Sequence, residues 1–97
     1  MLADLDGALT ITSAAGSETG NTVITVTEAP AAGNSYKYKV AANPTVPAVG
    51  DTCSSGYTNW NGTDEITAES GKKIVIVEVD ADNKCVAVGV AVVVSKE

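Results

Sequence analysis

The sequence predicts an all-β protein, an immunoglobulin-like antiparallel β-sandwich of about seven strands. Val, Ile and Thr are abundant and alternate with other residues over short stretches, as they do in strands. Gly, Pro, Asn and Asp punctuate these stretches, and no long stretch carries apolar residues at helical spacing. Short strands with frequent turns favour a sandwich. A small barrel is the alternative.

The first two strands are expected at residues 8–13 and 22–27, where apolar and polar residues alternate. The apolar residues that share one face of each strand are Leu9, Ile11, Ile24 and Val26. Residues 16–21 between them are rich in turn formers, so the two strands are predicted to form either a hairpin or two successive strands of a sandwich.

A third strand is predicted at residues 35–40. Tyr36, Tyr38 and Val40 fall on one of its faces, and the lysines between them are expected to face water. Residues 29–34 precede it and break the pattern, because proline lacks an amide donor and Gly-Asn tolerates positive φ. Residues 41–70 are the least regular region, with candidate short strands near 57–60 and 65–68. At least one short strand is expected there, since a structureless loop of that length is unusual.

The C-terminal hairpin is predicted from a strand at Lys73–Val79, a turn at 80–84 and a strand at 86–94. The last strand has two apolar faces, one made only of valine and one made of Ala87, Gly89, Ala91 and Val93. One face of such a strand usually meets water. We therefore expect the small-residue face to be an interface for docking or self-association. The alternative is that a loop, such as residues 41–49, covers it.

Length and charge restrict the classes of function. The 97 residues are predicted to form a single domain, 1–97. Twelve acidic residues against 6 lysines give a net charge of -6, which disfavours nucleic acid and anionic membranes as partners. No apolar run approaches the roughly 20 residues that span a bilayer.

The start of the chain and its two cysteines leave the compartment open. Residues 1–7 show no cationic segment followed by an apolar one, so no secretory signal is expected there. The protein is then either cytosolic or a module of a longer chain. Cys53 and Cys85 can form a disulfide only if the fold brings them together, and they stay reduced in the cytosol.

The residue inventory argues against an enzyme. Histidine is absent, which removes the commonest general base. Ser70 and Lys73 match an S-x-x-K pattern, but without the helix and companion motifs that this chemistry needs. Asp80, Asp82 and Asn83 could offer oxygen ligands to calcium, yet the twelve-residue loop is missing and these residues also favour turns. No catalytic residue, metal or cofactor is predicted.

The aromatic residues suggest one candidate binding site. Tyr57, Trp60 and Asn61 combine ring faces with an amide, the chemistry of a carbohydrate platform. The alternative is that Trp60 is the core tryptophan of a chain that has no phenylalanine.

Several passages resemble structural modules of bacteriophages, in particular head-fibre and capsid-decoration proteins. They are residues 8–17, 24–26, 33–39, 60–66, 71–84 and 89–91. Bacterial immunoglobulin-like repeats use similar turns. The resemblance implies a virion protein that is assembled in the host cytoplasm and performs no chemistry. Its partner would be the capsid or a second copy, bound through the C-terminal strand.

The function predicted from the sequence is therefore that of a non-enzymatic phage structural protein, which stabilises the particle or presents a binding surface. The alternative is a carbohydrate-binding or adhesion module of a bacterial surface protein.

Overall fold

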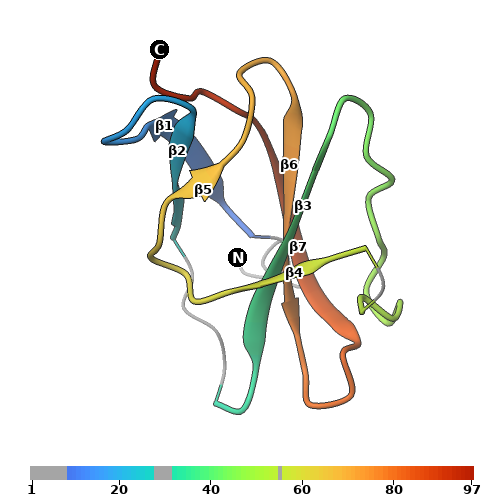
Figure 1. The fold of residues 1–97 in the computed structure, drawn as a ribbon. Helices are drawn as coiled ribbons and strands as arrows, with labels where there is room; N and C mark the ends of the chain where they lie inside the picture. The colour runs from blue at the N-terminus through green and yellow to red at the C-terminus, as the bar shows by residue number, and fades with distance from the viewer. Residues whose placement is uncertain (1–8, 28–31, 55) are drawn as a thin grey trace.

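The computed structural model describes residues 9–27, 32–54 and 56–97, which form two antiparallel sheets packed face to face (Figure 1). The predicted all-β sandwich is confirmed. Its strands are β1 (Ile11–Ala15), β2 (Asn21–Val26), β3 (Ser35–Ala41), β4 (Thr58–Trp60), β5 (Ile66–Thr67), β6 (Lys73–Val79) and β7 (Cys85–Val92). In this part of the chain there is no helix with the length and apolar character needed to cross a membrane.

The sheet order is immunoglobulin-like. One sheet has the order β1-β2-β5, and the other has the order β4-β3-β6-β7. In a constant-type immunoglobulin domain the fourth strand pairs with the first sheet. Here the short β4 instead pairs with β3, with Tyr36 opposite Trp60.

The strand positions follow the sequence prediction closely, including the two short strands within residues 41–70. The first strand begins at Ile11, three residues later than expected, and residue 8 lies outside the described part. Two other segments also lie outside the described part. They are residues 1–7, where no secretory signal is expected, and residues 29–31, which belong to the break before the third strand.

Strand β6 is the centre of the larger sheet. It pairs with β3 on one side and β7 on the other, so that Ile76 lies between Tyr38 and Gly89. Every residue from Ile74 to Val79 is buried. Both faces of this strand are therefore covered, which explains why its sequence is nearly continuous in apolar residues.

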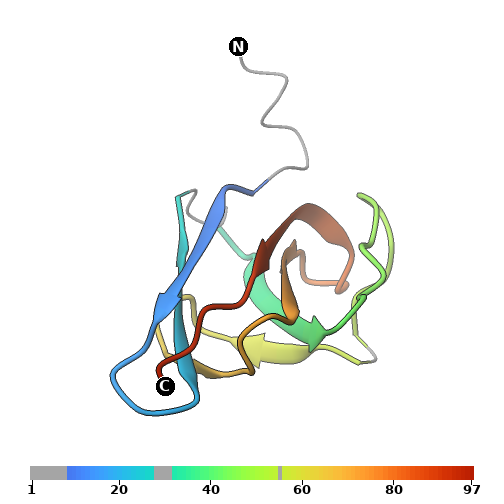
Figure 2. The ribbon, with the colours of Figure 1, turned by 90° about the horizontal axis from the view of Figure 1, so that it is seen from above.

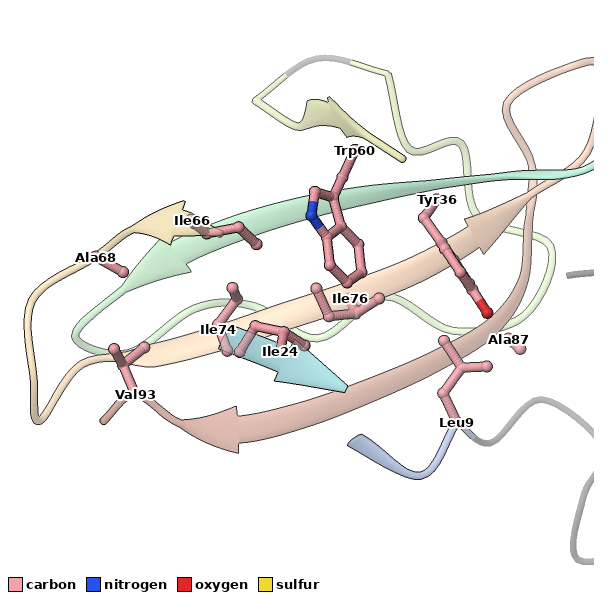
Figure 3. Close-up of a cluster of buried hydrophobic side chains, with 10 residues drawn as sticks. All are labelled: Leu9, Ile24, Tyr36, Trp60, Ile66, Ala68, Ile74, Ile76, Ala87 and Val93. Atoms are coloured by element: carbon pink, nitrogen blue, oxygen red, sulfur yellow. The ribbon is translucent and has the colours of Figure 1, made fainter. Parts of the chain in front are cut away.

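The inner core lies between the two sheets. Its buried members are Leu9, Ile24, Tyr36, Trp60, Ile66, Ala68, Ile74, Ile76, Ala87 and Val93 (Figure 3). The apolar faces predicted for the first three strands supply Leu9, Ile24 and Tyr36, so alternation places these residues correctly.

The C-terminal segment after β7 crosses from the larger sheet to the smaller one (Figure 2). On one side, Val93 exchanges backbone hydrogen bonds with Gly71 and Lys72 at 3.1 and 2.7 Å. Farther on, Lys96 donates to the Asn21 carbonyl at 2.9 Å and accepts from the Gly20 amide at 2.8 Å. This segment ties the two layers together at one end of the sandwich.

Candidate interaction surface

The small-residue face of β7 lies inside the sandwich. Ala87 and Val93 are buried in the inner core, and Ala91 packs against it. A Cβ added at Gly89 would lie 2.6 Å from the Leu9 carbonyl oxygen and 3.2 Å from Ile11 Cγ2. The first segment of the smaller sheet therefore covers this face and explains its small residues.

This placement differs from the expectation that Ala87, Gly89, Ala91 and Val93 would be a free interface. The cover is not the loop proposed as the alternative either. It is the chain around Leu9, whose amide donates to the Val88 carbonyl at 3.0 Å. These four residues therefore do not form a surface that is open to a partner.

The opposite, valine face is covered in one part and open in another. Val88 packs against a second cluster of buried residues on the outer side of the larger sheet. Beyond it, alternate valines emerge: Val90 is 42% exposed, Val92 57% and Val94 47%. We refer to Val90, Val92 and Val94 as the valine row. The valine row is exposed apolar surface, whereas the face expected to be an interface is buried.

The second cluster, called here the outer cluster, consists of Cys53, Val75, Val77, Val79 and Cys85, with Tyr57 and Val88 packed against it. Its cover is the loop between β3 and β4. Backbone hydrogen bonds of 2.7 Å join Gly50 to the Cys85 carbonyl, Cys53 to the Asn83 carbonyl and Cys85 to the Asp51 carbonyl. The loop thus leaves the valine row exposed while it seals the other end of the same face.

The three residues predicted as a carbohydrate platform do not share one surface. Trp60 is in the inner core, 8% exposed, with its ring 5.8 Å from that of Tyr36 (Figure 3). Its Nε1 donates to the Asp64 carbonyl at 2.8 Å. Tyr57 packs on the outer cluster, where the Lys39 Nζ lies 4.8 Å from its ring centre. The two rings lie on opposite faces of the larger sheet.

Asn61 stabilises the turn that follows β4. Its Oδ1 accepts hydrogen bonds from the amides of Thr63 and Asp64, both at 2.9 Å. This is the local use of an Asn side chain that turns favour. Trp60 and Asn61 do line an open hollow of about 780 Å³, together with Tyr36, Tyr38, Lys37, Asn59 and Glu65. Tyr57 does not line it.

The other polar motifs serve the backbone. Asp80 Oδ1 accepts from the amides of Asp82 and Lys84 at 2.9 and 3.0 Å, and Asn83 adopts a φ of 62°. The side chain considered for calcium thus shapes the hairpin turn. Within the described residues, no three His, Cys, Asp or Glu side chains gather where they could hold a metal ion.

The Ser70 hydroxyl, the candidate nucleophile of the S-x-x-K pattern, is also engaged. It accepts from the Ser95 amide at 2.8 Å and lies 2.9 Å from the Ser95 hydroxyl. It helps to hold the C-terminal segment.

Sequence reasoning also missed a polar clasp, in which both carboxylate oxygens of Glu65 accept from the Ser17 amide at 3.0 Å.

Comparison with known proteins identifies the family. The family described as S-layer protein SbsC C-terminal domain matches residues 14–96 of this chain. The chain belongs to this family. The crystal structure of the S-layer protein SbsC, domains 7, 8 and 9, is 28% identical with a TM-score of 0.74. The structure of surface layer protein SbsC, domains 4-9, is 27% identical with a TM-score of 0.69.

Each likeness covers 93% of this chain but only 28% and 14% of the two solved chains. The chain is thus similar to a small part of a long, multidomain surface protein. No curated protein matches the sequence.

The family membership corrects the predicted function. The phage reading, with its virion location and capsid partner, is wrong, because the match is to a surface layer protein. The alternative of a bacterial cell-surface module is the one that the comparisons support. The residues behind the phage resemblance lie mainly in strands and turns, which a sandwich fold requires whatever its function.

Proposed function

We propose that this chain is a non-enzymatic structural domain of a bacterial surface layer protein, and that it associates with a second copy through the valine row. The family match over residues 14–96 supports the first part. Val90 and Val92, exposed on alternate positions of β7, and Val94, exposed just beyond its end, support the second. Contiguous exposed apolar side chains commonly mark an interaction site.

The surroundings of the row suit a protein contact. Val90 lies opposite Val75 on β6, and Val92 lies opposite Lys73. The chain as a whole carries a charge of -6, which makes two copies repel at long range. Burial of valine side chains would supply the attraction at contact, and added salt would screen the repulsion.

The test is sedimentation of the whole chain over a range of concentrations. The wild type is expected to show a sedimentation coefficient that rises with concentration, more steeply in added salt. The double variant Val90→Lys, Val92→Lys is expected to remain monomeric, because each lysine would be buried without a partner.

The matched control is Val46→Lys, Val49→Lys, which changes two exposed valines on the loop between β3 and β4. This variant should associate as the wild type does. A wild type that stays monomeric at every concentration, or a Val90, Val92 variant that associates normally, would overturn the proposed contact.

A further inference from the structure

We infer that Cys53 and Cys85 form an intramolecular disulfide when this chain folds under oxidising conditions, and that the bond fastens the β3–β4 loop to the start of β7. The two cysteines come from distant parts of the sequence. In the fold both are buried, at 0% and 1% exposure, and both belong to the outer cluster.

The backbone holds the two cysteine segments side by side. Thr52 and Lys84 form an antiparallel bridge. The flanking hydrogen bonds, from Cys53 to the Asn83 carbonyl and from Cys85 to the Asp51 carbonyl, are both 2.7 Å long. Since side chains alternate along such a pair, the two cysteines share the face opposite to Thr52 and Lys84. The same hydrogen bonds pair Cys53 with Asn83 and Cys85 with Asp51, so the two cysteines, both free thiols in this structure, are diagonal neighbours on that face. Diagonal neighbours in a sheet lie somewhat farther apart than a disulfide allows, so the bond requires the β3–β4 loop to shift towards the start of β7.

The surroundings of the thiols indicate when the bond forms. Burial raises the pKa of Cys85 to about 11, with the neighbouring Cys53 as the next cause. Burial, followed by Cys53, also raises the pKa of Tyr57 to about 12. The thiolate is the reactive form, so the folded, reduced protein should oxidise slowly. The cross-link is expected to form during folding, while the thiols are still exposed.

The chemistry is thiol–disulfide exchange with a small-molecule disulfide, such as oxidised glutathione, as the oxidant. One cysteine thiolate attacks the oxidant, forms a mixed disulfide and releases one glutathione thiolate. The second cysteine thiolate then attacks the protein sulfur of that mixed disulfide and releases the second. The two protons lost by the cysteines end on the departing thiolates, and the two electrons reduce the oxidant.

The inference concerns the outer cluster and does not depend on the valine row. It fits a protein at the cell surface, where disulfides persist better than in the cytosol. The bond would close the chain from residue 53 to residue 85 and so restrict the unfolded state, which is the main source of disulfide stabilisation.

The experiment refolds the whole chain from denaturant in oxidised plus reduced glutathione, and in parallel in excess reductant. The oxidised sample is expected to lose about 2 Da, the mass of two hydrogens. Non-reducing peptide mapping should join the peptide of Cys53 to that of Cys85. The Tm of the oxidised sample should exceed that of the reduced sample by roughly 10 °C or more.

Two further measurements sharpen the test. The same oxidant added to protein that was folded in reductant should react many times more slowly than during refolding. The Cys53→Ala, Cys85→Ala variant should show the same Tm in both buffers. Unchanged mass after oxidative refolding, stable glutathione adducts, or a cross-link found only between molecules would overturn the inference.

Discussion

The two apolar clusters of this domain meet on opposite faces of one strand, β6, but they have different covers. Ile74 and Ile76 face the inner core, whereas Val75 and Val77 face the outer cluster, and all four are 0% exposed. A second sheet covers the first pair. The loop between β3 and β4, held by backbone hydrogen bonds near Cys53, closes over the outer cluster.

The difference shows that equal burial does not mean equal constraint. The inner core is enclosed by strands in a fixed register, so a change of volume there must be absorbed by two sheets. A loop can shift more easily over a smaller side chain. Where the loop's cover ends, the same valine face becomes the exposed valine row.

Ile76→Ala should have the largest effect. It removes side-chain atoms from a fully buried site between the sheets, and we expect a loss of about 4 kcal/mol in the free energy of unfolding. Urea denaturation followed by circular dichroism would measure it. A loss below about 1 kcal/mol would mean that the sheets can close over the cavity. The inner core would then be no more constrained than the outer cluster.

Gly89→Ala should cost about 2 to 3 kcal/mol, because the new Cβ would lie 2.6 Å from the Leu9 carbonyl oxygen. Val90→Ala at the neighbouring, exposed position is the control and should change the unfolding free energy by less than about 1 kcal/mol. The same denaturation experiment compares them. Equal effects at the two positions would contradict the assignment of the inner and outer faces of β7.

Val77→Ala should cost about 2 kcal/mol, less than Ile76→Ala at the adjacent position. Fewer methyl groups are removed, and the loop is free to settle into part of the space. Hydrogen exchange would show the distinction, since amides near Asp51 and Cys53 should exchange faster while those of β1 and β2 do not. Uniformly faster exchange in both sheets would refute the local response.

Glu65→Gln should have the smallest effect and a distinctive pH dependence. Hydrogen bonds from Ser17, and then from Asn21, hold the pKa of the Glu65 carboxyl below its usual value. A lowered pKa stabilises the fold above the unfolded-state pKa, near 4.3, and that contribution is lost as the pH falls through the folded-state value.

Thermal unfolding between pH 7 and pH 3 measures this difference. The variant should have a slightly lower Tm than the wild type at pH 7, and the gap should narrow as the pH falls. A difference in Tm that stays constant over this pH range would show that the charge of Glu65 does not contribute to its hydrogen bond with Ser17.

The strands could be predicted from the sequence because alternation and turn residues act locally. Lys73–Val79 is predicted with its observed bounds, and even the short β4 and β5 lie within their expected stretches. The faces of β7 could not be assigned in the same way. Both are apolar, and the choice between them depends on the approach of Leu9 to Gly89, which are far apart in sequence.

The candidate site shows the same limit. Alternation alone places Tyr57 and Trp60, three residues apart, on opposite faces of the short strand expected there, and the interpretation as a platform did not apply this rule. The contact of the cysteines required the β3–β4 loop to fold back over β6 and β7, which nothing in the local pattern specifies. Family membership rests on similarity along nearly the whole chain rather than on any single motif.

The crossing of the C-terminal segment has a mechanical consequence. Lys96 is hydrogen-bonded to Gly20 and Asn21 in one layer, and Val93 is bonded to Gly71 and Lys72 at the end of the other. A pull applied at this end of the backbone therefore meets the hydrogen bonds of Lys96 with the smaller sheet before it reaches Val93 and β7 in the larger one. Strand β7 is in this way shielded from being peeled off its neighbour directly.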